Sequence, residues 1–288
     1  MAVTSLCFLF SIRFRALSID MTSLMQIGNS VLIALMRALF LMACLLLGPN
    51  MVQAAGDWIE ICEGDAFICR SEVKVGQTEL PAMLKILRSE IEQKLGLESS
   101  DELLELYLFR NRRNFVEYVS QRIPEGASRQ ALYVKGEDRS RIYIYNHLAV
   151  RDDIRHECTH AILHHSLPYL PLWMDEGLAE YFEVEHQMRS TGNSHLGEMR
   201  FSMFFRHKPN MRELEQLNSL TEMDKSDYRD SWAWIHFLIH ESEESRQLLL
   251  EYLKEIREGE PPGPFSVILY RAMPNADERL KRHIKSWK

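Results

Sequence analysis

Apolar residues at helical spacing predict an amphipathic helix over residues 79–95. The apolar positions recur every three or four residues and share one face of the helix: Leu80, Leu84, Leu87, Ile91 and Leu95. Gly96 follows directly, and glycine is the residue that most readily takes the left-handed conformation at a helix end. The pattern therefore predicts a helix that packs against a hydrophobic core and ends at Gly96.

The next segments predict strands and one further helix. Residues 104–109 are so apolar that we expect a strand buried on both faces. Asn111 can cap a following helix that carries Phe115, Val119 and Ile123. Residues 132–134 and 142–145 look like two strands of a hairpin, joined by the polar, glycine-containing stretch 135–140.

Strand patterns fade after residue 151, and helical patterns follow one another. They cover residues 152–165, 174–186, 229–240, 243–257 and 275–287. This order predicts an α+β fold, in which an N-terminal α/β lobe with a small sheet and a hairpin (56–150) precedes a mainly helical lobe (151–288). A substrate site between the two lobes is expected, since clefts of this kind hold many ligands.

The first 55 residues have a different character. Residues 31–47 are almost wholly apolar, interrupted by Arg37, and small residues follow at Ala54 and Ala55. This pattern predicts a secretory signal peptide that is cleaved near Ala54 or Ala55. The alternative is a retained membrane anchor, because about 17 apolar residues is the lower limit for a span. Either way we expect a periplasmic or secreted protein that touches a membrane only through this segment.

Composition places the remainder among ordinary globular proteins. The 288 residues are 46% hydrophobic and carry a formal charge of −7. Cleavage would remove a net charge of +2 and leave −9, because the leader holds three arginines and one aspartate. An acidic body argues against nucleic acid as a partner. Cys62 and Cys69 flank a short stretch and could pair in an oxidising compartment, or they could remain free thiols.

The candidate chemistry is concentrated in the run His156-Glu157-Cys158-Thr159-His160, within the predicted helix 152–165. Residues i and i+4 lie on one helix face, so the two imidazoles can share a metal ion. Glu157 is placed to take a proton from water next to that ion, whereas Cys158 points about 200° away from His156. The run is therefore the short motif of zinc hydrolases.

A catalytic zinc site normally needs a third protein ligand. His164 continues the spacing of four residues, but it lies about 12 Å from His156 along the helix axis, too far to share the same metal ion. The longer three-histidine pattern fails as well, because Leu163 and Ser166 occupy its Gly and His positions. On the next predicted helix, Glu176 and Glu180 stand at i and i+4, so one can bind zinc while the other accepts the N–H of a ligand histidine.

The alternative for that helix is a solvated acidic face without a metal. Its members would be the four neighbouring carboxylates Asp175, Glu176, Glu180 and Glu183. Gly177 and Ala179 permit close approach of another helix on the same segment.

Two stretches together resemble a known family. His156-Glu-Cys-Thr-His160 followed by Leu-Pro-Leu-Trp-Met-Asp-Glu-Gly-Leu-Ala-Glu-Tyr-Phe is similar to the gluzincin metallopeptidases, particularly the peptidase-MA-like proteins. The resemblance covers about residues 130–240 and implies a thermolysin-like zincin architecture with one Zn²⁺. It also implies that Glu176 is the third ligand, that Glu180 supports a ligand histidine, and that Tyr228 hydrogen-bonds the oxyanion.

These observations predict a zinc metallopeptidase that hydrolyses peptides or proteins. His156, His160 and Glu176 would hold zinc, and Glu157 would act as the general base. A strand at 142–145 or 132–134 could bind extended substrate if it forms a sheet edge. The Gly-x-Met-Glu-Asn element of related aminopeptidases is absent, so exopeptidase action is not indicated. Two alternatives remain: a zinc-binding scaffold with a vestigial site, and a metal-free helix pair.

Overall fold

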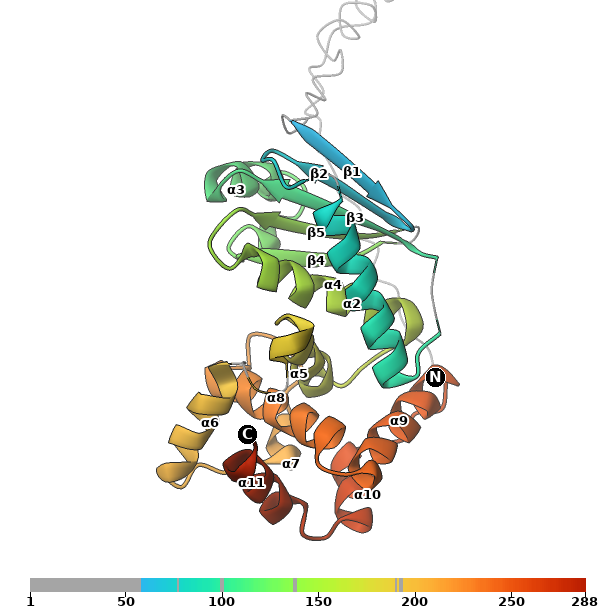
Figure 1. Ribbon diagram of the computed structural model, residues 1–288, viewed down its shortest axis with the longest axis vertical. Helices are drawn as coiled ribbons and strands as arrows, with labels where there is room; N and C mark the ends of the chain where they lie inside the picture. The colour runs from blue at the N-terminus through green and yellow to red at the C-terminus, as the bar shows by residue number, and fades with distance from the viewer. Residues whose placement is uncertain (1–57, 77, 99–100, 137–138, 190, 192–193) are drawn as a thin grey trace, which may run out of the picture. The chain divides into compact units, whose positions relative to one another are not determined.

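The computed structural model describes residues 58–288 except 77, 99–100, 137–138, 190 and 192–193 (Figure 1). They belong to one compact unit, Ala54–Lys288. The predicted leader, residues 1–55, lies outside the described residues. Among the helices that are described, none has the length and apolar content needed to cross a bilayer.

The fold is α+β and is built on a small mixed sheet. Its strands are β1 Glu60–Gly64, β2 Phe67–Ser71, β3 Leu103–Phe109, β4 Ala131–Lys135 and β5 Arg139–Tyr145. The order across the sheet is β1-β2-β3-β5-β4, with both outer pairs antiparallel and the inner pairs parallel. In the described part of the chain, β4 therefore forms one edge of the sheet, and the hairpin predicted around residues 135–140 joins β4 to β5.

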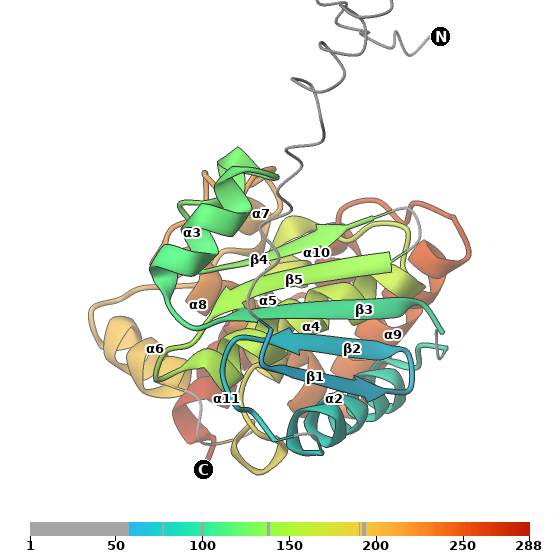
Figure 2. The ribbon, with the colours of Figure 1, turned by 90° about the horizontal axis from the view of Figure 1, so that it is seen from above.

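Both faces of the sheet are covered, as the apolar content of β3 predicts. Leu104, Leu106 and Leu108 contribute to the main core, together with α2 Glu79–Leu95 and α4 Val150–Ser166. Phe109 faces the opposite side and packs against α3 Arg112–Ser120. Figure 2 looks down on the strands, with α3 on the near side of the sheet and α4, α5 and α9 beyond it.

The C-terminal part is helical. Its elements are α5 Leu172–Phe182, α6 Ser194–Phe204, α7 Met211–Leu214, α8 Lys225–His240, α9 Glu243–Arg257, α10 Phe265–Ala272 and α11 Ala276–Ser286, with 3₁₀ turns at Pro124–Gly126 and His186–Met188. The same core cluster contains residues of α2, the sheet, α5 and α8, so the two lobes share one hydrophobic core.

Several predicted boundaries hold and two are wrong. The helix over 79–95 and the helix over 243–257 are confirmed, and Gly96 has the expected left-handed φ of 63°. The helix after Asn111 ends at Ser120 and excludes Ile123, because Ile123 precedes Pro124 and a residue before proline disfavours helical backbone.

The helix expected over 174–186 is also displaced. It begins directly after Pro171 and ends at Phe182. Two guanidinium groups bind the carbonyl oxygens beyond that point: Arg155 binds Glu183 O, and Arg189 binds Val184 O. Arg189 also binds Phe182 O, the acceptor that the N–H of residue 186 would use if the helix continued as predicted.

The stretch 63–68 is not a simple loop between two cysteines. It contains the tight turn of the β1–β2 hairpin, with Ala66 at φ 53°, and this turn places Cys62 opposite Cys69. Both thiols are buried and free in the structure. Of the two alternatives for this pair, the structure has the free thiols.

Candidate metal centre

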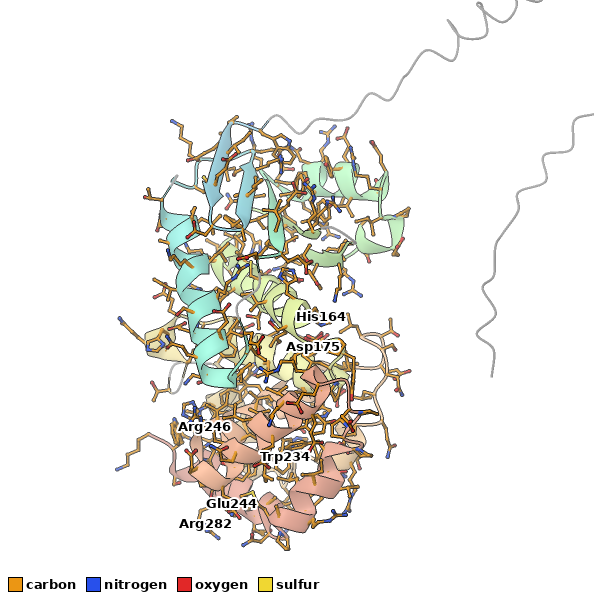
Figure 3. The ribbon with its side chains drawn as sticks, turned by 90° about the vertical axis from the view of Figure 1, so that its right-hand side faces the viewer. His164, Asp175, Trp234, Glu244, Arg246 and Arg282 are labelled. Carbon is orange, nitrogen blue, oxygen red and sulfur yellow. The ribbon has the colours of Figure 1, made fainter. Side chains whose placement is uncertain are left out.

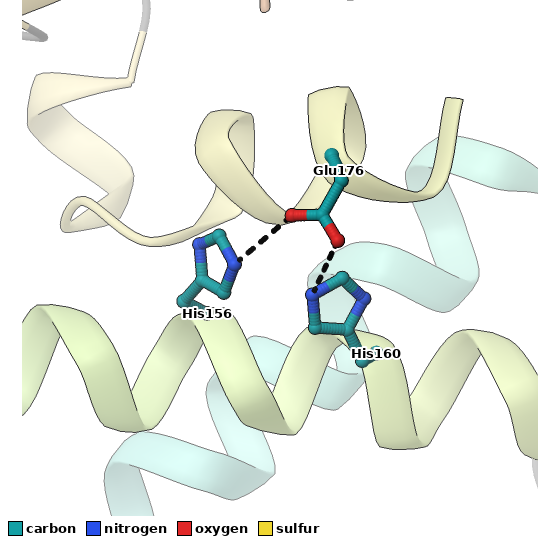
Figure 4. A group of neighbouring side chains, drawn as sticks. All are labelled: His156, His160 and Glu176. Carbon is teal, nitrogen blue, oxygen red and sulfur yellow. Dashed lines mark ion pairs between the residues drawn. The ribbon is translucent and has the colours of Figure 1, made fainter. Parts of the chain in front are cut away.

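The motif run lies in the middle of α4, and α5 crosses above it (Figure 4). The chain reverses between the two helices over residues 167–171, where Leu167 and Pro171 both have extended backbone. This reversal brings Glu176 of α5 over the face of α4 that carries His156 and His160. The acidic residue therefore comes from the helix that the sequence indicated.

The three predicted ligands converge. His156 Nε2 lies 3.6 Å from Glu176 Oε2, and His160 Nε2 lies 3.8 Å from Glu176 Oε1. All three ligand atoms lie within 4.8 Å of one another. Ligands of a tetrahedral zinc ion with bonds of about 2.0–2.1 Å are about 3.3 Å apart, so a small contraction would close the site. Two imidazole nitrogens and a carboxylate oxygen are also a usual donor set of a zinc hydrolase.

The other nitrogen of each imidazole already has a partner. His156 Nδ1 lies 3.3 Å from Glu183 Oε2, and His160 Nδ1 lies 2.9 Å from Asp175 Oδ1. A carboxylate at Nδ1 favours the proton on that nitrogen and leaves the lone pair of Nε2 free for a metal. Both rings are thus oriented with their Nε2 atoms toward Glu176.

The surrounding carboxylates stabilise positive charge at this place. Burial disfavours protonation of His160, but Asp175 outweighs it and raises the pKa of the imidazole to about 9. Burial likewise opposes protonation of His156, yet Glu176 and Glu183 raise its pKa well above the ordinary value. The pKa of Asp175 is held far below its usual range, since His160 and His164 together outweigh the effect of burial. The negative electrostatic potential of these carboxylates would also stabilise a bound metal cation.

His164 takes no place beside the three ligand atoms. Its Nε2 lies 2.8 Å from Asp175 Oδ2, so Asp175 bridges two histidines one helical turn apart. Figure 3 shows His164 and Asp175 next to each other, between the sheet and the helical part. His164 therefore orients Asp175, which in turn orients His160.

Glu157 lines the same cavity as the ligands. Burial raises the pKa of its carboxyl group, while the two neighbouring imidazoles oppose that shift. Cys158 is wholly buried on the other side of α4, as its spacing predicts, and burial raises the pKa of its thiol. A thiol in this setting stays protonated, and packing is its role.

Glu180 contacts a histidine that the sequence does not single out. Its Oε2 lies 2.6 Å from His195 Nε2 on α6, and Glu183 is the carboxylate that reaches His156 Nδ1. Glu180 also lies close to His156. A carboxylate oxygen of Glu180, a carboxylate oxygen of Glu183 and a ring nitrogen of His156 all lie within 4.8 Å of one another. The acidic support of His156 thus includes a residue one turn further along the chain.

The ligands open into a cavity of about 500 Å³. Its walls come from α4, α5, the edge strand β4 with the two residues before it, and the first turn of α8. The lining residues that the argument uses are Arg129, Leu132, Tyr133, Glu157 and Tyr228. Burial raises the pKa of Tyr228 to about 12, with a further contribution from Glu176 and Glu180. Its hydroxyl is therefore protonated at neutral pH and able to donate.

Residues 151–262 match the family described as "Protein of unknown function (DUF1570)". The matched stretch is less than half of the chain, and it contains the candidate ligands, Glu157 and Tyr228 but not β4. A search of curated proteins finds no match.

Three residues of this centre are not assigned a role by the sequence alone. Asp175 and Glu183 were visible only as members of an acidic face, and His195 lies in a stretch without a clear pattern. Their positions in the sequence could have indicated this role for the two carboxylates. Asp175 is adjacent to Glu176, and Glu183 lies two helical turns after Glu176 on the same side of the helix.

Proposed function

We propose that this protein is a zinc-dependent metallopeptidase of the gluzincin type. The observation that carries the proposal is the double orientation of the imidazoles: each Nδ1 has a carboxylate, and each Nε2 faces Glu176. A metal-free helix pair has no need of this arrangement. His156, His160 and Glu176 would hold one zinc ion, which supplies Lewis acidity toward water and a substrate carbonyl.

Glu157 supplies the proton chemistry. Its carboxylate accepts a proton from the attacking water and then donates it to the leaving amine. The raised pKa of Glu157 supports this role, because a base closer to neutrality returns the proton more readily. A site used only for structure would have no use for a base at this position, which disfavours the scaffold alternative.

Tyr228 donates a hydrogen bond to the oxygen that becomes negatively charged. Its place in the wall of the cavity and its protonated hydroxyl support this role. Arg129, on the same wall, is a second cationic or donor group that can contact the substrate. Together they complement charge that develops on the carbonyl oxygen.

The edge strand β4 binds extended peptide. Its residues Leu132 and Tyr133 line the cavity, and β5 pairs with only one side of β4. A peptide that adds to the other side forms backbone hydrogen bonds with β4 and passes over Glu176. The strand around residues 142–145 lies between β3 and β4 and therefore cannot serve in this way.

A thermolysin-like architecture is the fold that fits this proposal, with α4 and α5 as the two ligand helices below a sheet edge. Peptides or proteins outside the cytoplasm are the proposed substrates. The leader, residues 1–55, would deliver the enzyme there as a cleaved signal or as an anchor.

A peptide-library screen tests the proposal. Wild-type protein should cleave members of a proteome-derived peptide library, and Glu157→Gln should lower kcat by at least about 100-fold. Glu63→Gln, an exposed change on β1, is the matched control and should cleave normally. Equal cleavage by wild type and Glu157→Gln would overturn the mechanism.

A further inference from the structure

Three phenylalanine side chains are exposed together at the C-terminal end of α6. Phe201, Phe204 and Phe205 are 69%, 81% and 66% exposed. Their rings form one group, since the centroids of Phe201 and Phe205 lie 5.1 Å apart and those of Phe204 and Phe205 lie 5.3 Å apart. Phenylalanine is usually buried, so a contiguous exposed group indicates an interaction surface.

The backbone fixes these rings in place. Arg206 follows them at φ 67°, a left-handed conformation that residues other than glycine rarely adopt. The N–H of Arg206 donates to Met203 O and that of His207 donates to Ser202 O, which closes the helix end. Met203 is buried beneath, so the phenylalanines project from an anchored turn.

Basic residues lie next to these phenylalanines along the chain. From Met199 to Arg212 the chain carries four arginine or lysine residues and no aspartate or glutamate, whereas Glu198 and Glu213 border this stretch. Arg206 and Lys208 are exposed directly beside the phenylalanines. The five residues Phe201, Phe204, Phe205, Arg206 and Lys208 are called the aromatic–basic patch below.

We propose that the aromatic–basic patch docks the protein onto an anionic membrane surface. Aromatic rings that enter the interface and cations that contact acidic head groups are the two components of peripheral membrane binding. An anionic bilayer accepts both components of the patch, since its interface takes the aromatic rings and its head groups pair with the cations. The acidic surface of a second copy would match the cations alone. The patch belongs to α6 and not to the cavity, so this role is independent of peptide hydrolysis.

Vesicle flotation of the full chain tests the proposal. Vesicles of phosphatidylcholine alone are compared with vesicles that also contain phosphatidylserine. Insertion through residues 31–47 would occur in both, and the arginines of the leader are the same in every variant. The part of the phosphatidylserine-dependent binding that a patch variant loses therefore reports on the patch. We expect this added binding to decrease at least about tenfold in Phe201→Ser/Phe204→Ser/Phe205→Ser and in Arg206→Gly/Lys208→Gln.

Matched controls separate the patch from general hydrophobicity. Ile86→Ser/Leu148→Ser/Val267→Ser removes three other side chains that are more than half exposed, and it should bind as wild type does. Circular dichroism and the thermal midpoint check that each variant is folded. Unchanged added binding in both patch variants would overturn the proposal. So would a wild-type dimer that the phenylalanine changes dissociate, in the absence of lipid-dependent binding.

Discussion

At the scale of single residues, the two nitrogens of each motif imidazole are the decisive detail. The sequence predicts that His156 and His160 share a helix face and that a carboxylate of the next helix joins them, and the structure brings Glu176 to both. The sequence does not predict which carboxylates occupy the Nδ1 atoms. That choice depends on how α5 rotates about its axis, which periodicity alone does not determine.

Asp175, which bridges His160 and His164, should affect the affinity for zinc. Asp175→Asn removes the charge that orients His160 while keeping the size of the side chain. We expect the affinity for zinc to fall about tenfold or more, as with other changes behind a metal ligand. Competition with a zinc-sensitive dye measures the affinity. Asp65→Asn, an exposed change at the β1–β2 turn, is the control, and equal affinities of the two variants would contradict this role for Asp175.

At the scale of elements, the position of α5 depends on its contact with α8. A Cβ atom on Gly177 would lie 2.7 Å from Ser231 O and 2.8 Å from Ile235 Cγ1. The sequence indicates that Gly177 allows close approach, and the structure identifies α8 as the neighbour. Because Glu176 is the adjacent residue, the glycine also affects how far the proposed third ligand lies from α4.

Gly177→Ala should therefore disturb both stability and the metal site. We expect a loss of about 1–3 kcal/mol in the free energy of unfolding, because backbone atoms must shift to accept the methyl group. Gly197→Ala is the matched control on α6, where an added Cβ meets nothing within 4 Å. That change should stabilise slightly, as alanine does in helices. Urea unfolding measures both, and an equal effect of the two changes would refute the close-packing argument.

Other elements show which parts of the fold the hydrophobic pattern predicts and which it does not. The amphipathic helix over 79–95 is correct because its apolar face is narrow and repeats regularly. The β1–β2 hairpin was missed because β1 is an edge strand with mostly exposed residues, so its pattern carries little apolar signal. The helix end at Phe182 depends on Arg155 and Arg189, which come from elsewhere in the fold.

At the scale of the whole molecule, a buried group of histidines joins the C-terminal helix to α8. His236 Nδ1 lies 2.9 Å from His283 Nε2 on α11, and the hydroxyl of Tyr181 lies 2.8 Å from His240 Nε2. Burial lowers the pKa of His240 and of His283 to about 4, and Lys94 adds to the shift at His240. The imidazoles of His240 and His283 are therefore neutral in the folded protein at neutral pH.

This group makes stability depend on pH. Below the ordinary histidine pKa of 6.5 the unfolded chain binds protons that the folded chain does not, so the free energy of unfolding should fall as the pH decreases from about 6.5 to 4. We expect roughly 1 kcal/mol per histidine between about pH 7 and pH 5, after allowance for partial exposure. Urea unfolding at the two pH values measures the loss. His156 and His160 contribute in the opposite direction, because their pKa values are raised, so the comparison of wild type with His240→Gln isolates the contribution of His240. The variant should lose roughly 1 kcal/mol less than the wild type over this range, and an equal loss in the two proteins would contradict the assignment.

The central claim is that His156, His160 and Glu176 hold a zinc ion on which Glu157 acts. Its most direct test is the zinc content of purified wild-type protein, Glu157→Gln and Glu176→Gln, measured by elemental analysis beside peptide cleavage. We expect about one zinc per chain in the wild type and in Glu157→Gln, cleavage by the wild type alone, and loss of most zinc from Glu176→Gln. A wild-type protein without bound zinc, or a Glu176→Gln variant that keeps its zinc, would contradict it.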